Sequence, residues 1–119
     1  MAKVLVCGSR TWTYYEDGEL IREFIDSLPA DTIIVHGDAR GADRIAAACA
    51  FQRGLEVRAY PEKWALFGKR AGVLRNQEML DEEHPVLVAA FTLNIVTSKG
   101  KRDMVRRARD AGIPVEIRP

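Results

Sequence analysis

The sequence has few cysteines and few histidines. Cys7 and Cys49 lie far apart among apolar residues and match neither a zinc-binding pattern nor a disulfide framework. We interpret both as small core residues in a reducing compartment. His36 and His84 are the only histidines, and neither has a second ligand at metal-binding spacing. The sequence therefore predicts no metal site and no resident cofactor, and we expect magnesium only if a phosphate-bearing ligand brings it.

Long hydrophobic runs and a strong charge of one sign are also missing. The apolar runs are too short for a signal peptide or a membrane-spanning helix, so we expect a cytoplasmic protein without membrane partners. A formal net charge of +1 excludes a generally polycationic nucleic-acid coat. The 119 residues are 47% hydrophobic and 29% charged, which predicts one folded domain over residues 1–119.

Short apolar runs alternate with helical patterns along the chain. The apolar runs span 3–8, 32–37, 55–60, 85–91 and 113–117. The first, second and fourth are nearly continuous in Val, Ile, Leu and Ala, which is typical of strands covered on both faces, and the other two are expected nearer the sheet edges. Helices are predicted over 18–28, 41–53, 69–83 and 101–111, with Pro29 stopping the first and Gly54 capping the second. This order predicts an α/β fold, a single doubly wound, Rossmann-like domain with a mainly parallel five-stranded sheet.

Polar blocks follow the predicted strands. "GSR" follows the first, "HGDARGAD" closes the second, and "SKGKRD" comes after the fourth. Ligands of such sheets bind beyond the carboxyl ends of the strands. Gly37 lets the chain turn, and Gly41 opens a helix whose free N–H groups form an anion site. In such a site Asp38 or Asp43 would cap the helix or accept a hydrogen bond from a sugar hydroxyl. The alternative is that both glycines serve turn geometry alone and that Asp43 only caps the helix.

Four blocks carry a resemblance. "VLVCGSRTW", "HGDARGADRIAAACA", "AGVLRNQEM" and "SKGKRDMVRRARDAGIPV" resemble the signature blocks of the YspA, cpYpsA-related SLOG family of bacteria and their phages. Its superfamily includes the Lonely Guy phosphoribohydrolases and the DNA-processing protein A fold. The resemblance implies a homodimeric domain that binds a nucleotide or nucleotide-derived small molecule. By position it implies ligand contacts from Gly8, Ser9, Arg10, Gly37, Gly41, Ala42, Asp43, Arg75, Asn76, Ser98, Gly100 and Lys101.

The sequence departs from the phosphoribohydrolase pattern at its phosphate loop. Met104 stands where that pattern has a glutamate, and the helical period points Met104 inward. The neighbouring Asp103 is turned by about 100°. Two of the three loop glycines are missing, and the charges of Lys99, Lys101 and Arg102 are expected to compensate. Arg102 and, in the loop after the second strand, Asp38 are further ligand-binding candidates. These changes favour binding over catalysis. Hydrolysis of an N-glycosidic or phosphoester bond is the alternative, with Asp38, Asp43 or Asp103 as the acid.

Several other residues and one basic segment each allow more than one interpretation. The basic segment 99–109 is either a solvated helix face, with pairs Asp103–Arg107 and Arg106–Asp110, or a single-stranded DNA-binding stripe. Arg75 is a phosphate ligand or a surface arginine, and Arg10 is a ligand or a partner of Asp38 or Asp43. The remaining group consists of aromatic residues that either stack on a base, cover the sheet end or form a dimer contact: Trp12, Tyr14, Tyr15, Trp64 and Phe67.

Overall fold

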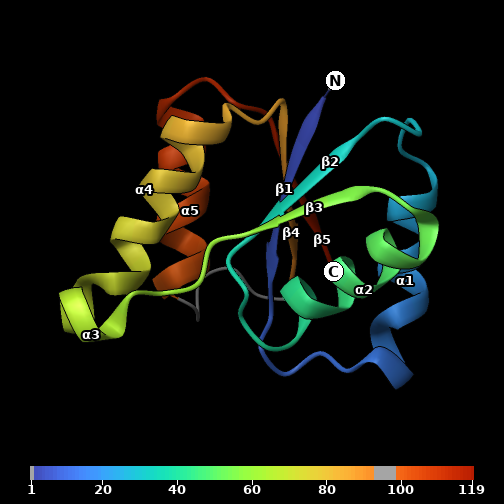
Figure 1. Cartoon of the computed structure of the whole chain (residues 1–119), viewed down its shortest axis with the longest axis horizontal. Helices are drawn as coiled ribbons and strands as arrows, with labels where there is room; N and C mark the ends of the chain where they lie inside the picture. Colours follow the sequence, from blue (N-terminus) through green and yellow to red (C-terminus); the bar gives the residue numbers. More distant parts are fainter. Residues whose placement is uncertain (1, 93–98) are drawn as a thin grey trace.

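A computed structural model describes residues 2–92 and 99–119, and it contains one parallel sheet (Figure 1). The strand order is β3-β2-β1-β4-β5, and every neighbouring pair is parallel. The strands are β1 (Lys3–Gly8), β2 (Ile33–His36), β3 (Glu56–Ala59), β4 (Leu87–Phe91) and β5 (Val115–Arg118). The predicted fold class is confirmed, and the two less apolar strands do lie at the edges.

Helices cover both faces of this sheet (Figure 1). Helices α1 (Tyr14–Asp26) and α2 (Ala42–Arg53) lie on one face, and α4 (Ala71–Glu83) and α5 (Lys99–Asp110) lie on the other. Alternate residues of β1 separate the two cores: Val4 and Val6 join the cluster under α1 and α2, while Leu5 joins the cluster under α4 and α5. Burial on both faces explains why the central strands are nearly continuous in apolar residues.

The first helix begins earlier than its apolar stripe. Thr13 is the N-cap, with its side-chain oxygen accepting from the backbone N–H of Glu16 at 3.2 Å. Asp17 in turn accepts from the backbone N–H of Thr13 at 2.8 Å. These reciprocal caps start the helix at residue 14, so the predicted start at 18 is wrong. The helix also ends at Asp26, before Pro29 can act as its stop.

The predicted helix over 69–83 is confirmed as α4 (Ala71–Glu83), with its start at Ala71 rather than at residue 69. A short helix α3 (Trp64–Phe67) and a 3-10 turn η1 (Gly68–Arg70) precede α4, which starts at Ala71. Gly68, the C-cap of α3 and the first residue of η1, has a φ of 56°, a conformation that glycine adopts at little cost. The predicted cap is confirmed for α2, because Gly54 is left-handed and donates to the carbonyls of Ala50 and Phe51. Among the described residues, the helices are too short or too polar to cross a membrane.

Candidate functional site

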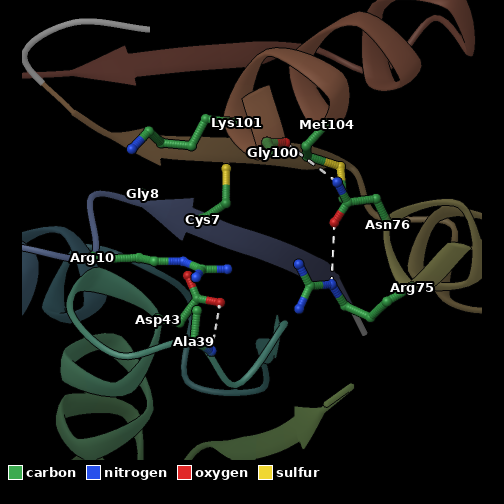
Figure 2. A pocket seen from close by; sticks show the side chains of 10 residues that line it. All are labelled: Cys7, Gly8, Arg10, Ala39, Asp43, Arg75, Asn76, Gly100, Lys101 and Met104. Carbon is green, nitrogen blue, oxygen red and sulfur yellow. Dashed lines mark hydrogen bonds between the residues drawn. The ribbon is translucent and has the colours of Figure 1, made fainter. Parts of the chain in front are cut away.

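A hollow of about 350 Å³ opens where the strand order reverses, between β1 and β4 (Figure 2). We call it the inner hollow. It lies beyond the carboxyl ends of the strands, as expected for ligand sites of open α/β sheets. Figure 2 shows Arg10 and Arg75 extending into it from opposite sides. Its lining comes from the end of β1, the loops after β1 and β2, the first turn of α2, helix α4 and the first turns of α5: Cys7, Gly8, Arg10, Ala39, Asp43, Arg75, Asn76, Gly100, Lys101 and Met104.

Two glycines hold the first two loops against each other. A Cβ on Gly8 would lie 2.5 Å from the carbonyl oxygen of Phe91 and 2.7 Å from Cβ of Ala42. A Cβ on Gly41 would lie 2.2 Å from the carbonyl oxygen of Ser9, which accepts from the backbone N–H of Ala42 at 3.0 Å. Ser9 donates its own N–H to Phe91 at 2.9 Å. Gly41, Ala42 and the backbone of Ser9 therefore join the loops together, and they do not line the hollow.

Asp43 braces the loop that follows β2. Its Oδ2 accepts from the backbone N–H groups of Gly37 at 3.0 Å and Ala39 at 3.3 Å. The residue is only 4% exposed, and burial raises the pKa of its carboxyl to about 6 although those N–H groups and the nearby Arg75 and Arg10 oppose the rise. Helix α2 has Gly41 as N-cap without a side-chain cap. Asp43 therefore stabilises the loop after β2 through backbone hydrogen bonds and does not cap helix α2.

Arg75 lies flat against the same loop. Its Nη1 donates to the carbonyl oxygen of Gly37 at 2.8 Å, and a Cβ on Gly37 would come within 2.7 Å of the guanidinium. The side chain is 12% exposed, so it is not a surface arginine. Its Nη2 is 3.6 Å from Oε1 of Glu62, which also lies 3.3 Å from Nη2 of Arg10. The sequence reading that paired Arg10 with Asp38 or Asp43 is wrong, because Glu62 supplies the partner.

Asn76 ties α4 to the start of α5. Its side-chain nitrogen donates to the carbonyl oxygen of Gly100 at 3.3 Å and to Asp103 at 3.1 Å, while its oxygen accepts from Nε of Arg75 at 3.2 Å. Asp103 also accepts from Arg107 at 2.8 Å and Arg106 at 3.1 Å. Burial acts to raise the pKa of Asp103, but the bonds from Arg107 and Asn76 outweigh it and hold that pKa low. Asp103 is therefore an ion-paired brace outside the lining of the hollow, and Arg106 pairs with it rather than as predicted with Asp110.

The inner hollow carries more positive than negative charge. Arg10, Arg75 and Lys101 line it together with one acid, Asp43, and the first turn of α5 adds its helix dipole. Burial lowers the pKa of Lys101, which indicates an ammonium group with reduced hydration. An anionic group entering the hollow would form charge-assisted hydrogen bonds with these cations.

Two apolar side chains complete the wall. Met104 is 1% exposed and points inward as predicted, so a thioether stands where the phosphoribohydrolase pattern has its acid. Cys7 is half-buried rather than a full core residue, and burial raises the pKa of its thiol to about 12. Such a thiol stays protonated at neutral pH and is no nucleophile. Cys49, by contrast, is buried in the core as predicted.

The structure brings together many of the predicted site residues and leaves others apart. Gly8, Arg10, Asp43, Arg75, Asn76, Gly100 and Lys101 line the inner hollow, whereas Gly37 and Asp38 line a neighbouring one. Arg102 lines a groove on the outer side of α5. Ser98 lies outside the described residues, and so does the side chain of Lys99. The sequence analysis did not identify Glu62 as the partner of the two arginines. Its position in the connection after the third strand was the one feature that placed it at this edge of the sheet.

The histidines have no partners for a metal. Within 2–92 and 99–119, no cluster of three or more His, Cys, Asp or Glu residues could hold an ion. His36 is buried, and its Nδ1 accepts from the backbone N–H of Asp38 at 2.9 Å. Burial lowers the pKa of His36, so the neutral ring shapes the loop in which Asp38 adopts a φ of 56°.

Comparisons with known proteins agree with this architecture. The chain is similar to the Gene 61 protein of Mycobacterium phage D29, with 39% identity over 121 residues, covering 97% of this chain and 94% of that protein. Its fold matches the X-ray structure of DNA processing protein A (DprA) from Streptococcus pneumoniae with a TM-score of 0.81 at 22% identity. That match covers 100% of this chain but 50% of the DprA chain, so the chain spans about half the length of that protein.

The family model that matches covers residues 2–67, from β1 to α3. This part of the chain includes the two loops joined by Gly8 and Gly41, and it includes Arg10, Asp43 and Glu62. The chain therefore belongs to the YspA, cpYpsA-related SLOG family.

Proposed function

We propose that this protein binds a nucleotide or nucleotide-derived small molecule, with the ligand's phosphate in the inner hollow. The observation that carries the proposal is the meeting of Arg10, Arg75 and Lys101, from three separate parts of the chain, at one hollow beside the start of α5. A guanidinium can hold a phosphate by two parallel hydrogen bonds. The hollow of about 350 Å³ falls in the range of small-molecule sites.

Calorimetry and thermal shift with a ligand panel test this proposal. The panel contains nucleoside monophosphates, cyclic nucleotides, ADP-ribose and ribose 5-phosphate. We expect at least one phosphate-bearing compound to bind, and we expect Arg75→Ala to weaken it by about tenfold or more, since a charge-assisted hydrogen bond contributes about 1.5–3 kcal/mol. The matched control is Arg70→Ala, which removes an exposed arginine that lines neither hollow. A panel without any binder would refute the proposal.

A second candidate function is hydrolysis of the bound nucleotide at its N-glycosidic or phosphoester bond. The observation that favours it is the carboxylate of Asp43, the single acid among the described residues that line the inner hollow. A carboxyl group with a pKa near 6 can exchange a proton near neutral pH.

Asp43→Asn tests this candidate, because the amide oxygen can still accept from Gly37 and Ala39. We expect wild-type protein to release free base or phosphate from a nucleoside monophosphate, measured by chromatography, and the variant to release neither while it still binds. Asp103→Asn is the control, since Asp103 lies outside the lining. Absence of product from the wild type would leave binding as the function.

A further inference from the structure

A second hollow adjoins the inner one. It measures about 400 Å³, and we call it the outer hollow. Arg10, Ala39 and Arg75 line both hollows, so the two are continuous along that wall. The remaining lining comes from the loop after β2, the first turn of α2, the connection after β3 and the start of α3: Gly37, Asp38, Arg40, Arg44, Pro61, Glu62 and Trp64. A ligand held by Arg10 and Arg75 can therefore extend from one hollow into the other.

Trp64 gives the outer hollow an aromatic surface. Its residue is 59% exposed, and α3, which it begins, has no buried residue. Trp12, the other tryptophan, instead packs against the buried ring of Phe91 at 6.0 Å between centroids. An indole next to arginines can stack on the flat ring of a ligand. The polar edges of the ligand's ring then stay in contact with water or with the guanidinium groups.

Glu62 stands on the boundary between the hollows. Its Oε1 lies 3.3 Å from Arg10 and 3.6 Å from Arg75, and the side chain is 15% exposed. A Cβ on Gly72 would lie 3.3 Å from this oxygen, so the glycine leaves room for the carboxylate. Arg40 and Arg44 also line the outer hollow, so its charge alone does not exclude an anion. The inner hollow differs in having Lys101 and the first turn of α5, whose helix dipole favours an anionic group there. The uncharged part of a ligand is then directed outward.

We propose that the outer hollow is the ring-binding half of the site, in which Trp64 stacks on a flat aromatic group of the ligand. The inference rests on the proposed function, since it needs the phosphate in the inner hollow. It deepens that function by naming the place and the residue that recognise the ring of the nucleotide. Trp64 is then a specificity-determining residue that separates nucleotides from sugar phosphates.

Fluorescence of a protein with one tryptophan tests this inference. Trp12→Phe leaves Trp64 as the only indole, because the chain has two tryptophans. AMP, GMP, CMP and UMP are titrated against ribose 5-phosphate, with binding followed in parallel by calorimetry. We expect at least one nucleotide to quench Trp64 in a saturable manner, and ribose 5-phosphate to bind without quenching it.

Substitution of Trp64 then separates stacking from general structure. Trp64→Ala should weaken nucleotide binding about tenfold and leave ribose 5-phosphate binding unchanged, whereas Trp64→Phe should retain most of the affinity. Leu66→Ala is the control, since Leu66 is exposed on the same short helix but does not line the outer hollow. Loss of both affinities in Trp64→Ala would mean that the residue only supports the fold.

The outcomes distinguish this inference from the proposed function. If nucleotides and ribose 5-phosphate bind equally well and Trp64→Ala changes neither, the ring subsite is overturned while phosphate binding in the inner hollow stands. If ribose 5-phosphate and all four nucleotides fail to bind, both are overturned. Only tighter binding of a nucleotide than of ribose 5-phosphate, together with its dependence on Trp64, supports the assignment.

Discussion

Single residues shape the candidate site mainly by being small or by being charged. Gly41 has a φ of 84° and ψ of −132°, and a side chain there would meet the backbone of Ser9 and Arg10. Glu62 and Asp43 place two carboxylates beside the arginines that the site presents to a ligand. Each of these residues supports a separate prediction.

Gly41→Ala should lower the free energy of unfolding by about 2 kcal/mol or more, because strained backbone and a steric clash act together. Gly54→Ala is the matched control: Gly54 has the same φ of 84°, lies in the αL region and has nothing within 4 Å of its Cβ position. It should cost only about 1 kcal/mol. Urea denaturation measures both values, and equal losses would show that the close approach to Ser9 contributes nothing.

Glu62→Gln should strengthen the binding of inorganic phosphate or AMP by about three- to tenfold. The substitution removes a negative charge that competes with the ligand for Arg10 and Arg75, and tenfold corresponds to about 1.4 kcal/mol. Isothermal calorimetry measures the change, and Glu116→Gln, which removes an exposed acid on β5, should have no effect. Weaker binding in Glu62→Gln would instead mean that the carboxylate holds the arginines in their binding positions.

We expect the difference in the free energy of unfolding between wild type and Asp43→Asn to depend on pH. Burial raises the pKa of the folded-state carboxyl from 3.8 to about 6, so the folded protein binds more protons than the unfolded chain between these values. The contribution of Asp43 to stability therefore falls as pH rises from about 4 to about 6. Relative to wild type, Asp43→Asn should gain about 1–3 kcal/mol between pH 4 and pH 7. Chemical denaturation at both pH values measures the gain, and a constant difference would contradict it.

At the scale of elements, α2 depends on small side chains. Its buried face carries Ala42, Ala46 and Ala50, each with no exposed surface, against the core that β1 shares with α1. The run "AAACA" at residues 46–50 supplies most of these small side chains. Short side chains let the helix lie close to the sheet, which also places Asp43 at the inner hollow.

Ala46→Leu should lower the free energy of unfolding by about 1–3 kcal/mol, because extra methyl groups in a filled core displace their neighbours. Ala47→Leu is the control, since Ala47 is half-buried on the same helix. It should change stability by less than about 0.5 kcal/mol. Thermal and urea denaturation measure both, and equal effects would show that α2 is not held close to the sheet.

For the whole molecule, the site exists only in the folded state. Arg10, Arg75 and Lys101 lie on three separate segments that the sheet brings to one edge. A ligand that needs all three has no binding site on the unfolded chain, and its binding free energy then adds to stability.

The predicted homodimer and cytoplasmic location stay predictions.

A bound nucleotide at one hundred times its dissociation constant should therefore raise the free energy of unfolding by about 2.7 kcal/mol. The midpoint of thermal unfolding should rise with ligand concentration in wild type and in Arg70→Ala, and much less in Arg75→Ala. Differential scanning fluorimetry with AMP and with ribose 5-phosphate measures it. A midpoint that is independent of ligand in all three proteins would contradict a site in the inner hollow.

Much of the fold could be predicted because strand and helix periods are local properties of the chain. The five strands, the edge positions of β3 and β5, and the inward side of Met104 were all predicted. The start of α1 was the least accurate, since the cap at Thr13 depends on hydrogen bonds to Glu16 and Asp17 rather than on apolar periodicity.

The candidate site shows what only tertiary structure decided. By itself the sequence determined which loops meet, because the carboxyl ends of parallel strands lie at one edge. Arg10, Arg75 and Lys101 were therefore predicted as ligand-binding residues, and all three line the inner hollow. It did not determine that Glu62 pairs with Arg10, that Arg102 faces another groove, or that Trp64 among five aromatics lines the outer hollow. The direction of a side chain and the partner of a charge depend on neighbours distant in the chain, and these neighbours are set only when the helices pack against the sheet.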